Sequence, residues 1–225
     1  MCGRYYRRSD KQRIAEAFRT GVPATFEILP SYNVTPQSFQ PVVRLNDETG
    51  ERELALLRWG LVPFWAKDAK VGYSTINAKA ETVATSAMFR EALKRRRCLV
   101  PADGFYEWQK IDAKTKQPYA IALADGSQFA FAGLWERWKD KATNQPLETY
   151  TIVTTEANEL TAAIHDRMPV ILAPRDYQRW LAQGDAARPP VDLLRPRPAE
   201  EMTAWKVGAA VGNVRNNDAS LCAPV

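Results

Sequence analysis

A run of strand-like segments that follow one another from residue 98 constrains the fold of this chain most strongly. Four of them are CLV (98–100), GFYEWQK (104–110), PYAIALA (118–124) and QFAFAGLWERW (128–138), and YTIVTT (150–155) is a fifth. Short polar turns, one of them Asp125-Gly126, link the first four. Antiparallel strands can be joined by such turns, whereas parallel strands need a long crossover. The sequence therefore predicts a mostly antiparallel sheet.

Outside this run, strands and helices are expected one at a time. PVVRL (41–45) and RELALLRW (52–59), joined by polar NDETGE, predict a hairpin. A first helix is expected after a capping box at Ser9–Gln12, with its end at Gly21. A second is expected at 86–96, with Met88, Phe89, Ala92 and Leu93 on its inner face. Two more are expected near 156–163 and at 174–183. A strand is expected at 168–173, a long loop at 61–79 and an irregular connection at 184–200. This pattern favours an α+β fold, a single domain over residues 1–225.

The net charge and the lack of apolar runs limit the classes of partner. Lys and Arg number 31 against 26 Asp and Glu, which gives a net charge of +5 and a pI of about 9.1. Such an excess suits a phosphate-rich partner, but it is also common on merely soluble surfaces. No run reaches the ~18 apolar residues of a membrane span, and the basic start MCGRYYRRSD precedes no apolar segment. We expect a cytoplasmic protein with no membrane partner.

The cysteine and histidine content argues against a disulfide framework and against a metal centre. The chain has three cysteines, Cys2, Cys98 and Cys222, and one histidine. This sparse, odd set offers no CxxC spacing and too few soft ligands for structural zinc. There is also no Gly-rich phosphate loop. We expect no metal and no cofactor, and we interpret Cys98 as a buried strand residue.

Cys2 could form an unusual bond to an aldehyde. Methionine aminopeptidases remove Met1 before a small residue, which would leave an α-amine beside the thiol. That amine has an ordinary pKa of roughly 7.7–8.0, so part of it is neutral and nucleophilic near neutral pH. The amine can form an imine with an aldehyde, and the sulfur can then close a thiazolidine ring. Gly3 would allow close backbone approach, although a cysteine at position 2 is often incidental.

Three other residues are candidates for proton transfer or sugar binding, and each has a structural alternative. His165 lies in IHDRMP between a helix and a strand, and its ordinary pKa suits proton transfer near neutrality, but lone histidines are often structural. Glu107 lies among aromatics in GFYEWQK and is either a desolvated acid–base group or a surface residue. Asn77, in TINAKAET, could cap a helix or bind a sugar.

Several aromatic and basic side chains could contact a nucleic acid. Trp65, Trp108, Met88 and Phe89 are core candidates by residue type, but bases stack on such side chains for about 1–3 kcal/mol each. Arg4, Lys79 and Arg167 lie within a few residues of the chemical candidates, which suits phosphate contacts.

Taken together, these segments resemble the SRAP family, the SOS-response-associated peptidases or abasic-site processing proteins. The matching motifs run in family order along nearly the whole chain: MCGR, SYNVTP (31–36), RWGLVPFW (58–65), INAKAET (76–82), TSAMF (85–89), PADGFYEW (101–108), IHDRMPV (164–170) and AVGNVRN (210–216). Each motif is weak alone, but the ordered set is specific. The resemblance implies a barrel-like β core with flanking helices.

The resemblance also implies a reaction and a set of roles. Cys2 would form a thiazolidine with the ring-opened sugar of an abasic site in single-stranded DNA, including single-strand/double-strand junctions. Asn77 would hold the sugar, Glu107 would transfer protons, and His165 would open the sugar and help reverse the bond. The residues implied to bind DNA are Gly3, Arg4, Asn33, Trp65, Lys79, Ser86, Met88, Phe89, Trp108, Thr154 and Arg167. We expect a monomer.

Two other functions stay open at this point. One is a thiol peptidase or hydrolase with Cys2 and His165 as nucleophile and base; the family is also described as an autopeptidase that exposes its cysteine. Only Met1 precedes Cys2 here, which argues against a need for such self-cleavage. The other is a module that binds single-stranded DNA without making a bond.

Overall fold

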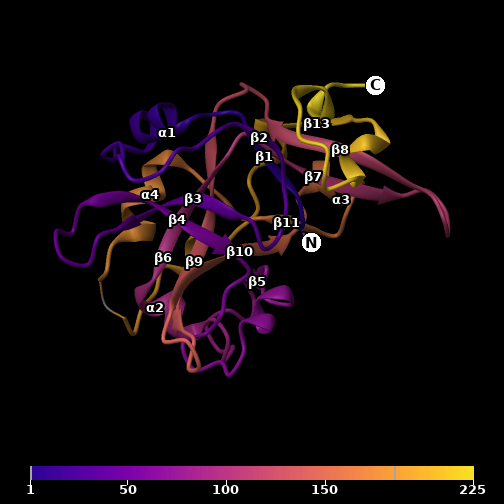
Figure 1. Ribbon diagram of the computed structural model, residues 1–225. Coiled ribbons are helices and arrows are strands. Elements are labelled where there is room, and N and C mark those ends of the chain that lie inside the picture. The colour runs from indigo at the N-terminus through magenta and orange to yellow at the C-terminus, as the bar shows by residue number, and fades with distance from the viewer. Residues whose placement is uncertain (1, 185) are drawn as a thin grey trace.

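The computed structural model describes residues 2–184 and 186–225, and it confirms an α+β fold built mainly from antiparallel strands (Figure 1). The strands are β1 (Tyr5–Arg7), β2 (Ser31–Val34), β3 (Phe39–Leu45), β4 (Arg52–Trp59), β5 (Asn77–Lys79), β6 (Arg97–Ala102), β7 (Gly104–Lys110), β8 (Lys116–Leu123), β9 (Phe129–Lys139), β10 (Pro146–Glu156), β11 (Arg167–Pro169), β12 (Ile171–Leu172) and β13 (Met202–Lys206). The helices are α1 (Lys11–Phe18), α2 (Arg90–Arg95), α3 (Glu159–Ala162) and α4 (Tyr177–Leu181).

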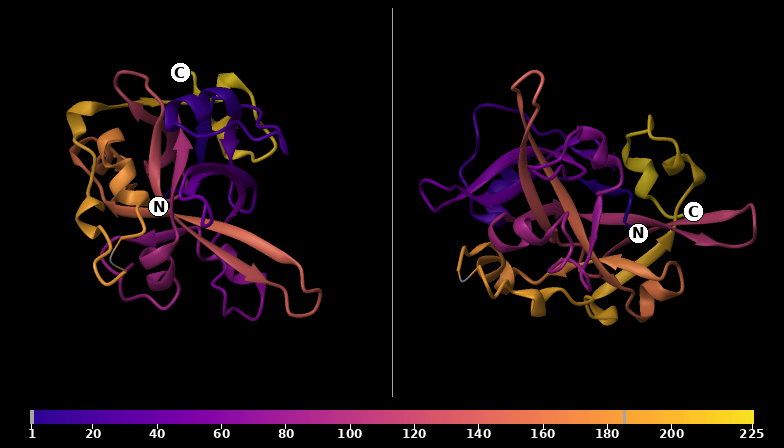
Figure 2. Two further views of the ribbon diagram at one scale, coloured as in Figure 1. Left: turned by 90° about the vertical axis from the view of Figure 1, so that its left-hand side faces the viewer. Right: turned by 90° about the horizontal axis from the view of Figure 1, so that it is seen from below.

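Five strands close into a barrel, as the resemblance predicted. β3 pairs with β4, β4 with β10, β10 with β9, β9 with β6, and β6 again with β3. Only the β4–β10 pair in this ring is parallel. The long β9–β10 ribbon projects beyond the barrel and is drawn in salmon in Figure 2. Closure leaves no free edge inside the ring, which makes it a rigid base for the residues beside it.

A second sheet, in the order β13-β8-β7-β1-β2, packs against the barrel and lies to its right in Figure 1. Aromatic rings join the two sheets. The ring of Tyr5 in β1 lies 5.3 Å from that of Trp59 in β4, and the ring of Phe105 in β7 lies 6.1 Å from that of Phe131 in β9. Such edge-on pairs add about 0.5–1.5 kcal/mol each beyond burial. The packing therefore fixes β1 and β7, the strands that carry the first residues of the chain and Glu107.

The hairpin predicted at 41–45 and 52–59 is confirmed, whereas β8 and β9, which Asp125-Gly126 joins, lie in different sheets. β3 and β4 pair from Leu45↔Arg52 outward, as expected for the segments at 41–45 and 52–59. β7 pairs with β8 in the same antiparallel manner. These elements depend on alternation and a nearby turn, so they were predictable from local sequence.

The ends of the first helix were predicted wrongly. Asp10, not Ser9, caps α1, because its carboxylate accepts a hydrogen bond from the Arg13 amide at 3.0 Å. The helix ends at Arg19 in the left-handed conformation (φ 56°), before Gly21. Ser9 is buried, and its carbonyl accepts a hydrogen bond from the guanidinium of Arg7. The start of this helix is thus set by a contact with β1.

The other predicted helices are shorter than expected, and one strand is divided. The segment 86–96 is helical only over α2, although Phe89, Ala92 and Leu93 do face the core and Met88 packs against it. The segment 156–163 is helical only over α3, and 174–183 forms a 3-10 turn at Pro174–Asp176 followed by α4. The strand expected at 168–173 divides into β11, which pairs with β10, and β12, which pairs with β9.

Four short strands were missed. β1, β2, β5 and β13 pair with partners that lie far away in the sequence, so no turn signals them. β5 lies at the end of the expected loop 61–79 and runs parallel to β10. The described part of 184–200 contains only the short 3-10 turns Val191–Leu193 and Ala199–Glu201. None of the helices within residues 2–184 and 186–225 has the length and apolar character to cross a membrane.

Candidate functional site

Cys2 lies just before β1, in the segment that continues alongside β7. Tyr5 pairs with Phe105 and Tyr6 with Gly104, and the amide of Tyr106 donates a hydrogen bond of 2.9 Å to the carbonyl of Arg4. Because the two strands are antiparallel, residues 2–4 run back along the part of β7 that holds Glu107. Cys2 is fully buried in the cluster that joins the two sheets.

The surroundings of Cys2 and Glu107 favour their neutral forms. Burial, and then the negative charge of Glu107, raises the pKa of the Cys2 thiol well above its ordinary value. Burial also raises the pKa of Glu107 to about 7. A carboxyl group with this pKa exists in both forms near neutral pH, which is what a proton-transfer group needs. Between the two alternatives for Glu107, the structure supports the desolvated carboxyl group.

His165 lies on the loop after α3, and a hydrogen bond ties that loop to β7. The Gln109 amide in β7 donates to the carbonyl of Ala163 at 2.7 Å. The Nδ1 atom of His165 accepts from the amide of Arg167 at 3.0 Å and lies 2.8 Å from the Asp166 carboxylate. Burial lowers the pKa of His165, although Asp166 acts in the opposite direction. Because its pKa is lowered from an ordinary value of 6.5, the imidazole is mostly neutral at pH 7.

Asn77 is the first residue of β5, and one of its two side-chain polar atoms accepts no hydrogen bond from the described residues. Its Nδ2 atom donates to the carbonyl of Ile76 at 3.0 Å, whereas its Oδ1 atom is buried and accepts no hydrogen bond from the described residues. A buried polar atom left unpaired costs about 1–3 kcal/mol. A donor on a bound ligand would remove that cost. Asn77 does not cap a helix here.

One apolar cluster connects these elements. It contains Cys2, and Ile76 and Ile164 pack against it. Those two residues directly precede Asn77 and His165. Cys2 and Glu107 thus lie close enough to interact electrostatically, and the chain that leads into Asn77 and into His165 packs against the cluster that contains Cys2.

Lys79, Thr154 and Arg167 meet at the edge of the barrel where β5, β10 and β11 run together. Lys79 pairs with Thr154, and the Arg167 guanidinium donates to the Thr154 carbonyl at 2.8 Å. Arg167 also forms a two-pronged ion pair with Glu81, with N–O distances of 2.6 and 3.0 Å. Lys79 is exposed and Thr154 is fully buried. We call Lys79, Glu81 and Arg167 the rim.

Arg4, Asn33 and Trp108 form a separate group that holds the C-terminal segment. The Arg4 guanidinium donates to Asn33 Oδ1 at 2.7 Å and to the Val211 carbonyl at 2.8 Å, and it lies over the Trp108 ring at 5.8 Å. Asn33 is buried, and its amide donates to the carbonyls of Val211, Asn213 and Asn216. Asn33 thus braces residues 211–216. Gly3 is half-buried beside Arg4.

The predicted stacking residues divide between surface and core. Trp65 is 46% exposed and its neighbour Phe64 is 55% exposed, so two aromatic side chains stand together on the surface. Phe89 is buried in the barrel-side core, and Met88 packs against that core. Ser86 accepts a hydrogen bond from the Met88 amide at 3.3 Å and stabilises the turn before α2. Trp65 and Phe64 are thus better placed than Phe89 to stack on a base.

Sequence reasoning missed Glu81, Gln109 and Asp166. Glu81 lies two residues after Lys79 in INAKAET, and Asp166 directly follows His165, so proximity to a predicted site residue was the only signal. Cys98 is buried inside the barrel as predicted, and burial raises the pKa of its thiol. Within the described residues, His, Cys, Asp and Glu side chains form no group of three or more that could hold a metal ion.

Comparison with known proteins gives one consistent family. A model of the SOS response associated peptidase (SRAP) family matches residues 1–214. Abasic site processing protein YoqW of Bacillus subtilis is 43% identical over 224 residues, which cover 98% of both chains. Abasic site processing protein YedK of Escherichia coli is 31% identical over the full length of both chains. A crystal structure of a protein from Bacteroides thetaiotaomicron superimposes over both whole chains with a TM-score of 0.88 at 27% identity.

Proposed function

Because this chain belongs to the SOS response associated peptidase (SRAP) family, we propose that it captures abasic sites in single-stranded DNA through a covalent bond to Cys2. Several relatives carry the name abasic site processing protein. The observation that carries the proposal is the burial of the Cys2 thiol beside Glu107, a carboxyl group with a pKa of about 7. This pair suits a reaction in which an amine acts first and a thiol second.

The reaction takes two steps and releases one water molecule. An abasic sugar opens to its aldehyde, and the α-amine of Cys2 attacks the carbonyl carbon to give an imine and water. The Cys2 sulfur then adds to the imine carbon, its proton passes to nitrogen, and a thiazolidine ring closes. Closure removes the imine that would otherwise promote strand cleavage by β-elimination. The product is a stable cap on the lesion.

In the proposed reaction Glu107 and His165 move the protons. The ionised form of Glu107 accepts the thiol proton and stabilises the positive charge of the protonated imine. His165, neutral at pH 7 because burial lowers its pKa, assists ring opening of the sugar and the reverse reaction. The buried Oδ1 atom of Asn77 accepts a hydrogen bond from the sugar or from the reacting amine. Lys79 and Arg167 hold phosphates at the rim.

The same observation argues against a thiol hydrolase. A cysteine nucleophile is normally activated by a lowered pKa, next to a cation or a helix N-terminus. The pKa of Cys2 is raised by burial and by the neighbouring carboxylate. A protonated thiol is a poor nucleophile for a peptide bond. It can still add to a protonated imine, because Glu107 accepts its proton during the step.

Single-stranded DNA fits the exposed aromatic pair. Phe64 and Trp65 are about half exposed on the segment between β4 and β5. Unpaired bases stack on such side chains without regard to sequence. A duplex hides these base faces, so we also propose binding at junctions where one strand becomes single.

The test is the intact mass of the protein after incubation with a single-stranded oligonucleotide that carries one abasic site. The expected species has the mass of the protein without Met1, plus the oligonucleotide, minus one water, and it survives heat and detergent. Cys2→Ala should form none of it and should still bind the oligonucleotide. A chain with Leu inserted between Met1 and Cys2, which keeps the amine away from the thiol, should also form none.

Cys222→Ala is the matched control, because Cys222 is half-buried near the C-terminus and away from Glu107. This variant should form the adduct at the normal rate. A heat-stable adduct in Cys2→Ala would exclude the aminothiol reaction. Binding without any adduct in the unmodified protein would instead leave a non-covalent DNA-binding module.

A further inference from the structure

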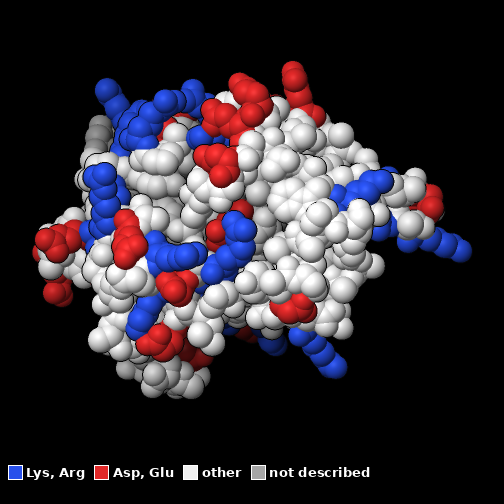
Figure 3. Space-filling model, turned by 90° about the horizontal axis from the view of Figure 1, so that it is seen from above, with Lys and Arg blue, Asp and Glu red and all other residues white. Residues whose placement is uncertain are grey.

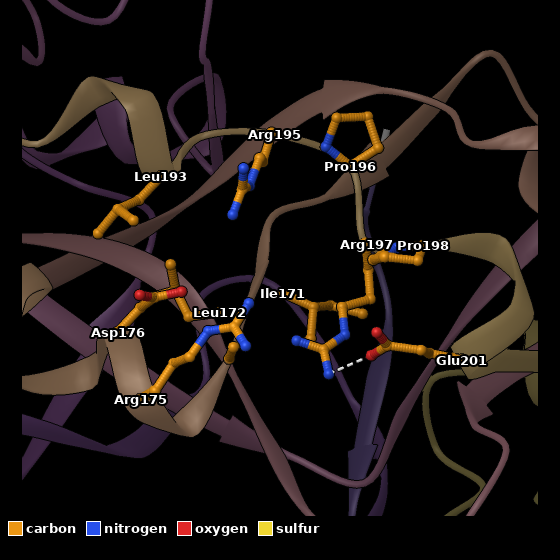
Figure 4. A pocket seen from close by; sticks show the side chains of 11 residues that line it. Ile171, Leu172, Arg175, Asp176, Leu193, Arg195, Pro196, Arg197, Pro198 and Glu201 are labelled. Carbon is orange, nitrogen blue, oxygen red and sulfur yellow. Dashed lines mark ion pairs between the residues drawn. The ribbon is translucent and has the colours of Figure 1, made fainter.

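Two hollows adjoin on a surface that contains none of the residues of the proposed reaction. The first, of about 420 Å³, is lined by Ala17, Phe18, Arg19, Arg52, Gln128, Pro174, Arg175 and Tyr177. The second, of about 310 Å³, is shown in Figure 4 and is lined mainly by 171–176 and 193–201. Arg175 lines both. We call the two hollows together the arginine groove.

The arginine groove lies on a different part of the core from Cys2. Phe18 and Tyr177, which stack at 5.4 Å, belong to the cluster that includes α2 and α4. Cys2 belongs to the cluster that joins the barrel to the second sheet. A ligand in the groove would therefore affect binding without touching the reacting groups.

Positive charge exceeds negative charge in this groove. The side chains of Arg19, Arg175 and Arg195 are exposed and make no hydrogen bond or ion pair with the described residues. The first hollow has no carboxylate in its lining. In the second, Glu201 pairs with Arg197, and Asp176 is the other carboxylate of the lining (Figure 4). Across both hollows the lining residues Arg19, Arg52, Arg175, Arg195 and Arg197 outnumber these two carboxylates.

Arg52 and Arg19, which both line the first hollow, lie close enough for their positive charges to repel. Arg52 is fixed by hydrogen bonds to the Phe18 carbonyl at 2.9 Å and to Gln178 at 3.0 Å. Its pKa is lowered by burial and then by the charge of Arg19. Seen from above, Lys and Arg side chains lie among Asp and Glu side chains on the left-hand side of the molecule (Figure 3). Clustered guanidiniums that outnumber the carboxylates beside them favour the binding of an anion.

We propose that the arginine groove binds the phosphodiester backbone of single-stranded DNA away from the lesion. This inference rests on the proposed function, because it names a second contact for the same substrate. Guanidinium groups match phosphate oxygens with paired hydrogen bonds, and each neutralised phosphate releases a counterion. Several adjoining arginines suit a ligand with regularly repeated charge. The groove would hold a strand that extends beyond the reach of the rim.

The experiment compares two variants that each lose three positive charges. The groove variant is Arg19→Gln/Arg175→Gln/Arg195→Gln. The control variant is Lys139→Gln/Lys141→Gln/Lys206→Gln, whose residues are exposed on the β9–β10 ribbon and at the end of β13. The affinity of each variant is measured for one oligonucleotide of about 5 nucleotides and for another of about 30. These lengths are chosen because single-strand-binding surfaces cover about 4–16 nucleotides. Melting temperatures confirm that both variants fold.

The groove variant should bind the long oligonucleotide about tenfold more weakly than the control variant does. The slope of log affinity against log salt should fall by about 2, because single-stranded DNA contributes about 0.7 per phosphate contact. Affinity for the short oligonucleotide, and its adduct yield at saturation, should be unchanged.

Two outcomes would contradict the proposal that the arginine groove binds DNA away from the lesion. Equal losses in the groove and control variants would show a general effect of net charge. Equal losses on the short and the long oligonucleotide would place these arginines at the Cys2 site. Failure of the proposed function has a different signature, namely no adduct in the unmodified protein with either oligonucleotide.

Discussion

Two carboxylates near the predicted site, Glu107 and Glu81, have opposite environments. Glu107 is 4% exposed, and burial raises its pKa to about 7. The side chain of Glu81 is about half exposed, and its hydrogen bonds to Arg167 lower its pKa. The first can gain or lose a proton near neutral pH, whereas the second stays ionised. A group that titrates near neutral pH thus lies at the centre of the predicted site, and a fixed negative charge lies at its rim.

This difference predicts that changes at the centre alter the rate of bond formation and that changes at the rim alter affinity. The two effects can be measured separately. Adduct formation at saturating oligonucleotide reports the chemistry, and equilibrium binding of Cys2→Ala variants reports affinity without reaction. A centre variant that alters affinity, or a rim variant that alters the rate at saturation, would contradict this division.

Glu107→Gln should give the largest effect, a fall of about 10²–10³ in the rate of adduct formation at pH 8, with DNA affinity nearly unchanged. Glutamine has the shape of a protonated glutamate. The unmodified protein loses its ionised Glu107 as the pH falls through about 7, so its rate should approach that of the variant by pH 5.5. The measurement is the ratio of the two rates across this pH range.

Glu107→Asp is the matched control, because it keeps a titrating group and should keep a pH-dependent rate. Burial of an ionised carboxylate costs stability, so Glu107→Gln should melt at no lower a temperature than the unmodified protein at pH 8. A rate ratio that is constant with pH would mean that Glu107 acts only by filling space.

How much of this site was predictable depends on how local each signal is. The hairpins follow from alternation and turns, so β3–β4 and β7–β8 were predicted with nearly correct ends. β1 and β5 were missed because their partners, β7 and β10, lie about 100 and about 75 residues away in the sequence. These missed strands are the ones that position Cys2 and Asn77. The spacing of 2, 77, 107 and 165 alone therefore could not indicate a site, and the resemblance supplied it.

Side-chain partners were even less predictable than strands. Asn33 was expected at the DNA, and its placement as a DNA ligand stays a prediction, but its amide donates to three backbone carbonyls at 2.8–3.3 Å. Arg167 was expected to be available for phosphate, whereas Glu81 occupies its guanidinium. A charged residue near a motif gives no sign of which opposite charge it will contact, because that depends on how β5 and β11 meet β10.

Arg167→Gln should give the second largest effect, a fall of about threefold to tenfold in DNA affinity. The slope of log affinity against log salt should fall by about 0.7, as expected for one lost phosphate contact. The rate of adduct formation at saturating oligonucleotide should stay the same. Arg167→Lys is the control: it keeps the charge and should recover the salt slope, but it loses the paired hydrogen bonds to phosphate. A fall in the saturated rate equal to the fall in affinity would place Arg167 at the centre instead.

Glu81→Gln should give the smallest effect and the opposite sign, a gain in DNA affinity of about twofold to fivefold. The ion pair between Glu81 and Arg167 competes with phosphate for the guanidinium, and exposed pairs of this kind are worth about 0.2–1 kcal/mol. Because Arg167 lowers the pKa of Glu81, the competing charge is present throughout the neutral range, so the gain should be the same at pH 6 and pH 8.

Two comparisons decide whether that gain comes from Arg167. Glu156→Gln removes the same charge from the residue paired with Arg167 across β10 and β11. Glu156 forms no ion pair with the side chains that the structure describes, so this variant should change affinity less. In the Arg167→Gln background, Glu81→Gln should have almost no effect, because the guanidinium it would release is gone. A gain that persists in that background would mean that Glu81 repels the DNA directly. The rim would then bind through Lys79 and long-range charge, and Arg167 would serve only to fix β11 against β10.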